Sequence, residues 1–501
     1  MSSSGETPAR SFQASRATAP LVRFQDAMEQ IHRFLAFHAA GQPIPSPAGD
    51  AHVAADPAHQ PLHALPSSSS FAAVRAWYGF PSGGGFRPPL TRPDFLPDFL
   101  GTGRGSMPLR AGRRASVSLP LDQIAGRVLA TEIRAERDQP PFPRATRDGF
   151  ACRAAEANSH QFLLLTARIR AGQQFAGVLG PGEACEIMTG APVPSGADAV
   201  LMVEHCEQTS NCVRLVSNRT VAVGENIVPQ AAEARIGDVL VPPGARLDAR
   251  HVALAAQQGY RDLTVSPRPL VAILTTGDEL VPLTQQPGTA QIRNSNAPML
   301  AALVTALGGE PLVLPSAPDT AEALSESLRE AMAADLLLLS GGISVGRFDL
   351  VETALTQAEA RFFFGGVAIQ PGKPVAFGQL PRTADRAGGD PLPFLALPGN
   401  PISTAVTFHL FAAPILAGLA GCSDALPRFA LAQFTGRWQG RPGLTRFLPA
   451  ACDFSASPQV RLVPWQGSGD LAALARSNCF IAIDEQAESI ADGAIVPILL
   501  S

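Results

Sequence analysis

Apolar positions recur at different spacings along this chain, and the changes in spacing divide it into regions. Residues 21–38 place apolar side chains every three or four positions, which predicts one amphipathic helix. Residues 120–135 predict a short helix followed by a strand, and residues 248–258 predict another helix. Between residues 150 and 222, short apolar runs separated by Gly and Pro predict a small all-β domain.

Residues 269–423 follow a different pattern, in which strands alternate with helices. Apolar runs such as VAIL, LLLL and FLAL predict buried strands of a parallel sheet. Helical patterns at 294–309, 320–334 and 402–421 separate these runs, so we expect an α/β domain with helices on both faces of the sheet. The residues from 427 onward return to short alternating strands and predict a second β domain.

Composition adds one feature that periodicity does not show. Residues 43–112 are rich in Pro and Gly and include the run Ser67–Ser70, which indicates a flexible insertion with a possible docking role. The chain as a whole is 46% hydrophobic and 16% charged, an ordinary globular balance. Its formal net charge of −4 argues against a nucleic-acid partner, and the absence of a long continuous apolar run argues against a membrane span.

The N-terminus has no apolar core of a secretory signal. Seven cysteines without a C-x-x-C motif argue against a disulfide framework. Both observations favour a cytoplasmic location.

Three loops at predicted strand ends carry candidate chemistry. In open α/β sheets, ligands bind beyond the carboxyl ends of the strands. The loops combine small residues and Gly, which turn backbone N–H groups toward an anion, with carboxylates that can hold a divalent cation. The third loop also opens a helix, whose N-terminus favours negative charge. Together they predict a phosphorylated ligand with Mg²⁺. The loops are Thr275–Leu280, Ser340–Asp349 and Leu397–Ser403.

The basic residues point to one further candidate. Lys373 is the only lysine among 39 basic residues, and it stands in a Pro-Gly turn just before a predicted strand. We expect its ammonium group at the same sheet edge. Asp148-Gly149 and Thr189-Gly190, in the β-rich region, are simple turns on physical grounds alone.

Eight strings of the sequence, taken in order, resemble one known family. They are ATRDGFA, IMTGAPVPSGADAV, GENI, TTGDEL, NSN, SGGISVGRFD, PGKPVAFG and LPGNPIS. This order is similar to that of the molybdopterin molybdenumtransferases, the MoeA family, which includes the E-domain of gephyrin. The resemblance runs from about residue 115 to the C-terminus, and the helix at 21–38 looks like the first helix of the family.

The resemblance implies a multidomain α/β plus β fold: a MogA-like α/β molybdopterin-binding domain, an inserted β domain, a discontinuous elongated domain and a C-terminal β-barrel-like domain. Residues 1–20 would be a disordered tail and 43–114 the flexible insertion. The implied domains are 21–42 with 115–147 and 223–268 (elongated), 148–222 (inserted β), 269–423 (α/β) and 424–501 (C-terminal).

The reaction that the resemblance implies is molybdenum insertion. Adenylylated molybdopterin binds with Mg²⁺, molybdate enters the dithiolene, and AMP is released. The family also implies a homodimer whose active site is shared between subunits, with molybdopterin adenylyltransferase and molybdoenzyme maturation proteins as further partners.

Individual roles follow by motif position and are expectations of the resemblance. The metal would be held by Asp278, Glu279 and Asp349. Further catalytic residues would be Asp148, Thr189, Asp319 and Lys373, with the first two reaching the site across the dimer interface. Substrate would be bound by Thr276, Gly277, Ser340, Gly341, Gly342, Ser344, Gln370, Pro398, Gly399, Asn400, Pro401 and Ser403.

Several positions depart from the family pattern. Gln370 stands where the family often has lysine, so one anion contact is lost beside Lys373. Glu233 stands where the family has aspartate, and Ala145 and Arg147 replace a common Ser and Met. Gln370 and Glu233 leave a catalytically impaired family member as one alternative. A scaffold that binds molybdopterin or partner proteins is a second. A molybdopterin adenylyltransferase is a third, but the extra β domains and the LPGNPIS and MTGAPVP strings argue against it. Tungstate is a further alternative to molybdate as substrate.

Overall fold

The computed structural model describes residues 21–40, 115–342, 350–382 and 390–501. The predicted tail and insertion, and the site residues Ser344 and Asp349, lie outside these ranges. Contacts divide the chain into two compact units, Ser118–Val265 and the remainder.

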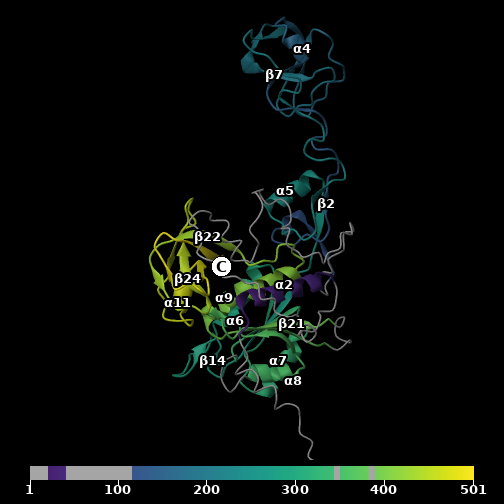
Figure 1. Ribbon diagram of the computed structural model, residues 1–501. Coiled ribbons are helices and arrows are strands. Elements are labelled where there is room, and N and C mark those ends of the chain that lie inside the picture. The colour runs from purple at the N-terminus through teal and green to yellow at the C-terminus, as the bar shows by residue number, and fades with distance from the viewer. Residues whose placement is uncertain (1–20, 41–114, 343–349, 383–389) are drawn as a thin grey trace, which may run out of the picture. The chain divides into compact units, whose positions relative to one another are not determined.

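A six-stranded mixed sheet forms the centre of the α/β domain (Figure 1). Its first four strands are parallel and its last two are antiparallel to their neighbours. In spatial order the strands are β16 (Glu310–Val313), β13 (Leu270–Thr275), β17 (Leu336–Ser340), β21 (Leu392–Leu397), β20 (Ala376–Leu380) and β18 (Arg361–Gly365). The helices are α6 (Asn296–Ala306), α7 (Ala321–Ala331), α8 (Leu350–Gln357), α9 (Pro401–Thr407) and α10 (Ala413–Leu419), with a π-helical turn, η4 (Phe408–Ala412), between the last two.

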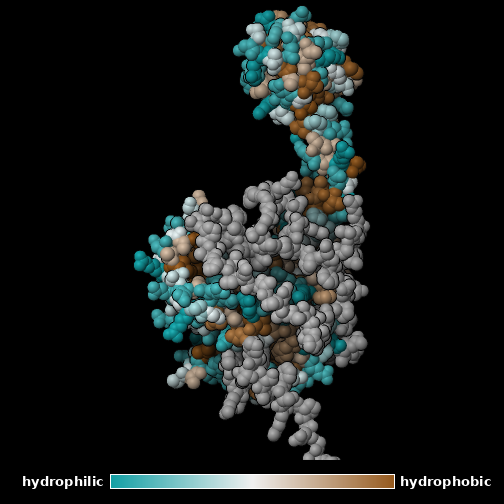
Figure 2. All heavy atoms as spheres, viewed as in Figure 1, coloured by the Kyte–Doolittle hydropathy of each residue, from teal (hydrophilic) through white to brown (hydrophobic). Residues whose placement is uncertain are grey.

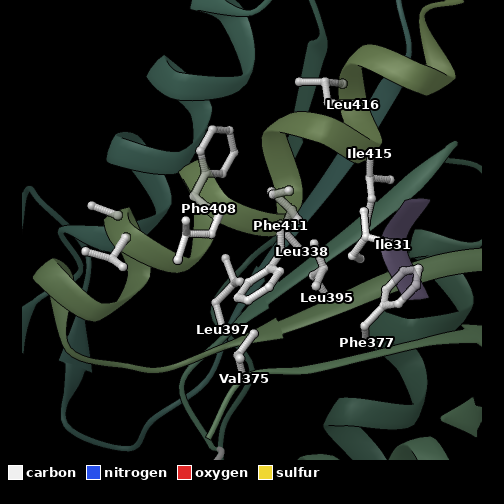
Figure 3. Packing of buried hydrophobic residues seen from close by; sticks show 14 of the residues in the cluster. Ile31, Leu338, Val375, Phe377, Leu395, Leu397, Phe408, Phe411, Ile415 and Leu416 are labelled. Atoms are coloured by element: carbon white, nitrogen blue, oxygen red, sulfur yellow. The ribbon is translucent and has the colours of Figure 1, made fainter. Parts of the chain in front are cut away.

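Alternate residues of each central strand enter opposite cores, because successive side chains of a strand point to opposite faces. Leu338 of β17 and Leu395 of β21 pack with η4 and α10 on one face, where Figure 3 shows them beside Phe411 and Ile415. Leu337 and the other side chains on the opposite face of the sheet pack against α7 and α8. This double burial explains why these strands are apolar throughout rather than alternating.

Helix α2 (Phe24–Ala40) packs against this domain, in agreement with the amphipathic pattern of its sequence. Its Phe24 makes edge-on contacts with Phe411 and with Phe447 of the C-terminal domain. Ile31, fully buried, faces the same core as Ile415 (Figure 3).

The continuous helical segment Pro401–Leu419 is long and apolar enough to cross a membrane by composition, but 78% of it is buried inside the protein. Its apolar character is that of a core helix: Ile402, Phe408 and Leu416 all belong to the core shared with α2.

The C-terminal domain contains a closed five-stranded barrel. Strand β24 pairs with both β25 and β26, so the order β24-β25-β22-β28-β26 returns to its start. Closure leaves the barrel strands without a free edge. In addition, β19 (Ile369–Gln370) pairs in parallel with the first two residues of β24. The barrel strands are β22 (Phe429–Phe434), β24 (Thr445–Cys452), β25 (Gln459–Leu462), β26 (Cys479–Ile483) and β28 (Ile495–Leu500), and β23 (Trp438–Gln439) pairs with β27 (Ser489–Ile490).

The other unit contains a six-stranded sheet in which only β5 and β6 are parallel. Figure 2 shows a mixture of hydrophilic and hydrophobic residues on its surface, and Phe162 and Leu164 of this sheet region are about half exposed. In spatial order the strands are β7 (Ala199–Met202), β4 (Gly149–Cys152), β6 (Glu183–Ile187), β5 (Leu163–Ile169), β9 (Cys212–Leu215) and β8 (Cys206–Gln208), with the short helix α4 (Ala154–Ala157) after β4.

Two segments far apart in sequence build the rest of this unit. Ile133 and Leu129 share one core with Leu247 and Leu263. The segment that precedes the six-stranded sheet in the sequence therefore packs against the segment that follows it. The elements of these two segments are β1 (Val117–Pro120), η2 (Leu121–Gln123), β2 (Ile133–Arg134), β3 (Arg144–Ala145), β10 (Ile227–Val228), β11 (Val239–Val241), α5 (Ala249–Gln257) and β12 (Asp262–Val265), and the short helix η3 (Val203–His205) connects β7 to β8. All seven cysteines of the chain are free.

The expected fold class is confirmed, and three local features were missed. The sequence pattern did not predict the antiparallel strand β18 or the antiparallel direction of β20. It also did not predict helix α11 (Leu471–Arg476), which Asp470 caps by accepting a hydrogen bond from the amide of Ala473. Helix α11 is too short for a helical repeat to show, and the direction of β20 depends on chain connections that periodicity does not encode.

We expect Leu338→Ala to lower the free energy of unfolding of the α/β domain by about 2–5 kcal/mol, because a fully buried side chain leaves a cavity. Urea unfolding followed by hydrogen exchange of the central strands measures this. Leu283→Ala, at a 60% exposed position, is the control and should change stability by less than about 0.5 kcal/mol. Equal losses in both variants would contradict the described core.

Candidate active site

The order of the parallel strands creates a topological switch point between β13 and β17. After β13 the chain crosses through α6 to β16 on one side, and then through α7 to β17 on the other side. Open α/β sheets bind ligands outside the carboxyl ends of the strands at such a point. Thr275 ends β13 and Ser340 ends β17, so two of the three predicted loops begin there.

The structure brings these loops into direct contact. The amide of Thr276 donates to the carbonyl of Ser340 at 3.1 Å, and the amide of Gly341 donates to the carbonyl of Leu397 at 3.4 Å. The hydroxyl of Ser340 lies 3.4 Å from the carbonyl oxygen of Pro398 and donates to it. The three predicted loops therefore form one continuous edge.

Asn296, the first residue of α6, joins two of the loops. Its side-chain amide donates to the hydroxyl of Ser340 at 2.9 Å and to the carbonyl of Gly399 at 2.7 Å. Asn294, two residues earlier, also joins two segments. Its side-chain amide donates to the hydroxyls of Thr275 and Ser316 at 2.8 and 3.0 Å. The site-residue expectations did not include these asparagines, although the NSN string contained them.

Glycines permit this close approach. Gly341 has a φ of +97°, and a Cβ at this position would lie 2.3 Å from the carbonyl oxygen of Thr276. A Cβ on Gly342 would lie 2.6 Å from the hydroxyl oxygen of Thr276. At Gly277, with φ +148°, a Cβ would lie 2.6 Å from the carboxylate of Glu279. A side chain at Gly341 would clash with the backbone of Thr276 and displace the loops, whereas at Gly277 the carboxylate of Glu279 would have to move.

Three buried polar atoms along this edge have no hydrogen-bond partner among the described residues. They are Oγ1 of Thr276, Oδ1 of Asn296 and Oδ1 of Asp319. A buried polar atom without a partner costs free energy, and such atoms are rare in folded proteins. Their grouping at the switch point indicates that this edge is built to bind something.

Three acidic residues carry the negative charge of the edge. Asp278 accepts a hydrogen bond from the backbone amide of Asp319 at 3.0 Å. Burial raises the pKa of Asp319, and the negative charges of Asp278 and Glu279 raise it further. Within the described ranges no group of three acidic, His or Cys side chains is close enough to enclose a metal ion.

The third loop leads into α9 and is tied to the C-terminal domain. Pro401 occupies the first turn of the helix, and Ser403 is buried. Asn400 does not cap the helix with its side chain but donates to the hydroxyl of Ser468 at 2.8 Å. The carbonyl of Ser468 accepts from the amide of Ile402 at 2.9 Å. Ser468 is a site neighbour that sequence reasoning did not single out.

Lys373 and Gln370 flank the turn that precedes β20. Ala376, which starts β20, lies opposite Ala396, near the end of β21, so the turn approaches the carboxyl edge. The side chain of Lys373 is exposed. Gln370, also exposed, accepts a hydrogen bond from Arg446 of the C-terminal domain at 3.1 Å.

Asp148 and Thr189 lie in the other unit, where the structure brings them together. Both the amide and the hydroxyl of Thr189 donate to Oδ1 of Asp148, at 2.6 and 2.8 Å. These bonds to Thr189 lower the pKa of Asp148. Both side chains are exposed. Nearby, Glu233 pairs with Arg144 at 3.2 Å.

Family models match most of the described chain. Residues 104–259 match the MoeA N-terminal region (domains I and II), residues 272–418 match a probable molybdopterin-binding domain, and residues 432–501 match the MoeA C-terminal region (domain IV). A molybdopterin molybdenumtransferase of Nostoc sp. is 38% identical over 59% of this chain and 67% of its own length. The enzyme of the same name from Staphylococcus aureus is 30% identical over 77% of this chain and 91% of its own length.

The chain belongs to the molybdopterin molybdenumtransferase family. It is an enzyme of that class with a role in molybdenum cofactor biosynthesis. A solved structure agrees: the molybdopterin biosynthesis MoeA protein of Pyrococcus horikoshii superposes with a TM-score of 0.64 at 27% identity, covering 77% of this chain and 95% of that protein. The family model for molybdopterin binding spans all three loops of the edge.

The acidic group yields a prediction about ionisation in this family member. We expect Asp278→Asn to lower the pKa of Asp319 toward its ordinary value, because one of the two nearby negative charges is removed. Carbon-13 NMR titration of the Asp319 carboxyl measures the change. Glu322→Gln is the control: Glu322 lies three residues away but does not contribute to the shift, so its removal should leave that pKa unchanged.

The raised pKa of Asp319 also predicts how the stability of the fold changes with pH. The native state holds the Asp319 proton more tightly than the unfolded chain does, so the contribution of this group to stability falls as pH rises between the ordinary and the raised pKa. Asp278→Asn should make this fall smaller. A larger fall in the variant would contradict the described electrostatics.

Proposed function

We propose that this enzyme inserts molybdate into adenylylated molybdopterin and releases AMP. The single observation that carries the proposal is the switch-point edge, where three hydrogen-bonded loops meet beside buried polar atoms that have no described partner. A ligand that combines phosphate groups with a divalent cation suits this edge, because the cation would bind carboxylate oxygens and screen the phosphate charge, while the Thr276 hydroxyl can donate to a phosphate oxygen. Hydrolysis of the phosphoanhydride would consume water and free AMP as the molybdenum enters the dithiolene.

Mg²⁺ is the cofactor that we propose for this reaction, and the donor set fits it. Asp319 keeps one buried carboxylate oxygen without a described partner. Burial raises its pKa, and the nearby carboxylates of Asp278 and Glu279 raise it further. Oxygen donors of this kind suit Mg²⁺, which commonly binds one or two carboxylates together with substrate phosphates. Asp278 and Glu279 would hold the ion, and we keep Asp349 as a proposed third ligand. When bound, Mg²⁺ would neutralise phosphate charge.

The other residues have proposed binding and positioning roles. Ser340 and Asn296 hold the second and third loops together, and this contact fixes the width of the edge. Lys373 would bind substrate oxyanions, and Ser344 and Ser403 would bind them through hydroxyl groups. Thr276, Gly277, Gly341, Gly342 and the segment Pro398–Pro401 would line the ligand with backbone.

We further propose that the enzyme acts as a homodimer in which Asp148 and Thr189 of one subunit complete the site of the other. Their hydrogen-bonded pair is exposed, and the bonds to Thr189 favour the ionised form of Asp148, so a charged and oriented carboxylate is presented at the surface. We also propose a cytoplasmic location, with an adenylyltransferase supplying the substrate and maturation proteins receiving the product.

The direct test supplies purified protein with adenylylated molybdopterin, Mg²⁺ and molybdate, and follows AMP release together with activation of an apo-molybdoenzyme. We expect AMP release that depends on molybdate. Glu279→Ala should reduce it by about 100-fold or more, while Glu326→Ala, at an exposed position of α7, should not. Full activity of Glu279→Ala would refute the role of that residue.

Binding of substrate without turnover would favour a scaffold or an impaired enzyme. Repeating the assay with tungstate in place of molybdate tests whether the enzyme also accepts the second oxyanion.

Mixing two inactive variants tests the shared site. Each proposed site combines Glu279 of one subunit with Asp148 of the other. In a heterodimer of an Asp148→Asn subunit and a Glu279→Ala subunit, one site therefore contains both changes and the other site contains neither. Random exchange of subunits should therefore restore about a quarter of the wild-type activity. Mixing the Glu279→Ala and Asp278→Ala variants is the control and should restore none, because both changes lie in the same domain. The absence of recovery in the first mixture, with exchange verified, would exclude a shared site.

A further inference from the structure

Three polar side chains from separate segments form a closed ring of hydrogen bonds beside the end of β13. Thr275 is the last residue of β13, Asn294 lies two residues before α6, and Ser316 lies in the loop between β16 and α7, residues 314–320. The amide nitrogen of Asn294 lies 2.8 Å from the hydroxyl oxygen of Thr275 and 3.0 Å from that of Ser316. The two hydroxyl oxygens are 2.9 Å apart. The ring therefore joins three segments through side chains alone.

The number of protons in this ring determines the direction of its bonds. The amide group of Asn294 can donate one proton to each hydroxyl oxygen, so the third bond uses the proton of one hydroxyl group. The other hydroxyl proton has no acceptor among the described residues. Because Thr275 is 1% exposed and Ser316 is exposed, we assign the donor role to Thr275, which leaves the proton of Ser316 to solvent. The carbonyl oxygen of Asn294 accepts from the amide of Ala297 at 3.1 Å, which fixes the orientation of the side chain.

The loop that contains Ser316 also carries Asp319, one of the acidic residues of the edge. The amide of Ala317 donates to the carbonyl of Thr275 at 2.9 Å, and the amide of Asp319 donates to Asp278 at 3.0 Å. The second bond places two residues of like charge side by side, and like charges repel. One carboxylate oxygen of Asp319 is also buried without a partner among the described residues, which costs free energy. The loop therefore needs stabilising contacts elsewhere, and the ring supplies them three residues before Asp319.

We propose that Asn294, Thr275 and Ser316 are positioning residues of this enzyme, which hold the loop between β16 and α7 so that Asp319 stays beside Asp278 before any ligand binds. The ring acts through the backbone of the loop rather than by contact with the reacting groups. This proposal deepens the proposed function and rests on it, because the reaction would need both carboxylates in place beside the substrate phosphates. Groups that are already in place need no reorganisation during the reaction. A neutral ring suits this task, because it adds no charge to the edge.

Hydrogen exchange in the full-length, metal-free protein tests the restraint on the loop without turnover. Thr275→Val keeps the shape of the side chain but removes its hydroxyl group, so one N–H of Asn294 loses its acceptor. We expect the peptide that spans residues 314–320 to exchange about tenfold faster or more, because the loop opens more often. Mass spectrometry of this peptide measures the change, and the peptide that contains β17 should exchange as in the wild type.

Matched variants separate the ring from the general stability of the domain. Ser316→Ala, at an exposed position, should open the loop in the same way, and it serves as the main variant if Thr275→Val does not fold. Thr275→Ser keeps the hydroxyl group and should exchange nearly as the wild type does. Thr305→Val is the control, because the hydroxyl of Thr305 donates to the carbonyl of Ala301 within α6, at 2.8 Å. Combining Thr275→Val with Ser316→Ala should add less than the two separate effects, because both changes break the same ring.

The rate of AMP release tests whether the restraint serves the reaction. Displacing Asp319 should lower kcat by about tenfold, while KM for adenylylated molybdopterin should change by less than about twofold, because most contacts with the substrate remain. Thr275→Ser should restore the wild-type kcat, and Thr305→Val should leave it unchanged.

Unchanged exchange of the loop in the folded Thr275→Val and Ser316→Ala variants would overturn the proposal. An equal rise in the exchange of β17 would also overturn it, since that result would indicate a general loss of stability. Faster exchange of the loop with an unchanged kcat would refute the positioning role and leave the proposed function standing. If the wild type releases no AMP, the proposed function fails, and the exchange experiment still decides whether the ring holds the loop.

Discussion

The close approach of three backbones at the carboxyl ends of β13, β17 and β21 is the constraint on which the rest of the site depends. The amides of Thr276 and Gly341 reach across to carbonyls of the neighbouring strands, and there is no room for a Cβ at Gly341. Because the strands beneath are buried on both faces, the loops cannot shift without disturbing two cores. The sheet therefore holds the edge rigid, and the edge in turn sets where a ligand can lie.

Electrostatics adds a second layer to this rigid edge. The acidic side chains of Asp278, Glu279 and Asp319 lie at its β13 end, where burial raises the pKa of Asp319 and the charges of the other two raise it further. Lys373 belongs to the turn before β20, whose first residue lies opposite Ala396 near the end of β21. A ligand that combines phosphate groups with a divalent cation would offset both charges together, which neither a simple anion nor a simple cation would do.

Much of the fold was predictable because its signals are long and periodic. The apolar strands of the α/β domain and the helices between them follow from repeated patterns, and Gly-rich loops at strand ends marked the edge. The contacts that join the loops were not predictable in the same way, because Asn296 and Ser468 act through single hydrogen bonds with partners distant in sequence. The partner of Gln370 likewise depends on the register of β19 against β24, which no local pattern encodes. The pairing of Asp148 with Thr189 is a similar case, since each alone resembles an ordinary turn.

The short strand β19 has a consequence for how this protein can vary. It belongs to the sheet of the C-terminal domain, yet the chain leaves it directly for a strand of the α/β domain. Asn400 and Ser468 form a second link between the same two domains. A chimaera that replaced the C-terminal domain with that of a relative would replace Arg446 and Ser468, the hydrogen-bond partners of Gln370 and Asn400, at the same time. These domains are therefore not interchangeable modules, and residues on either side of the link must be inherited as a matched set.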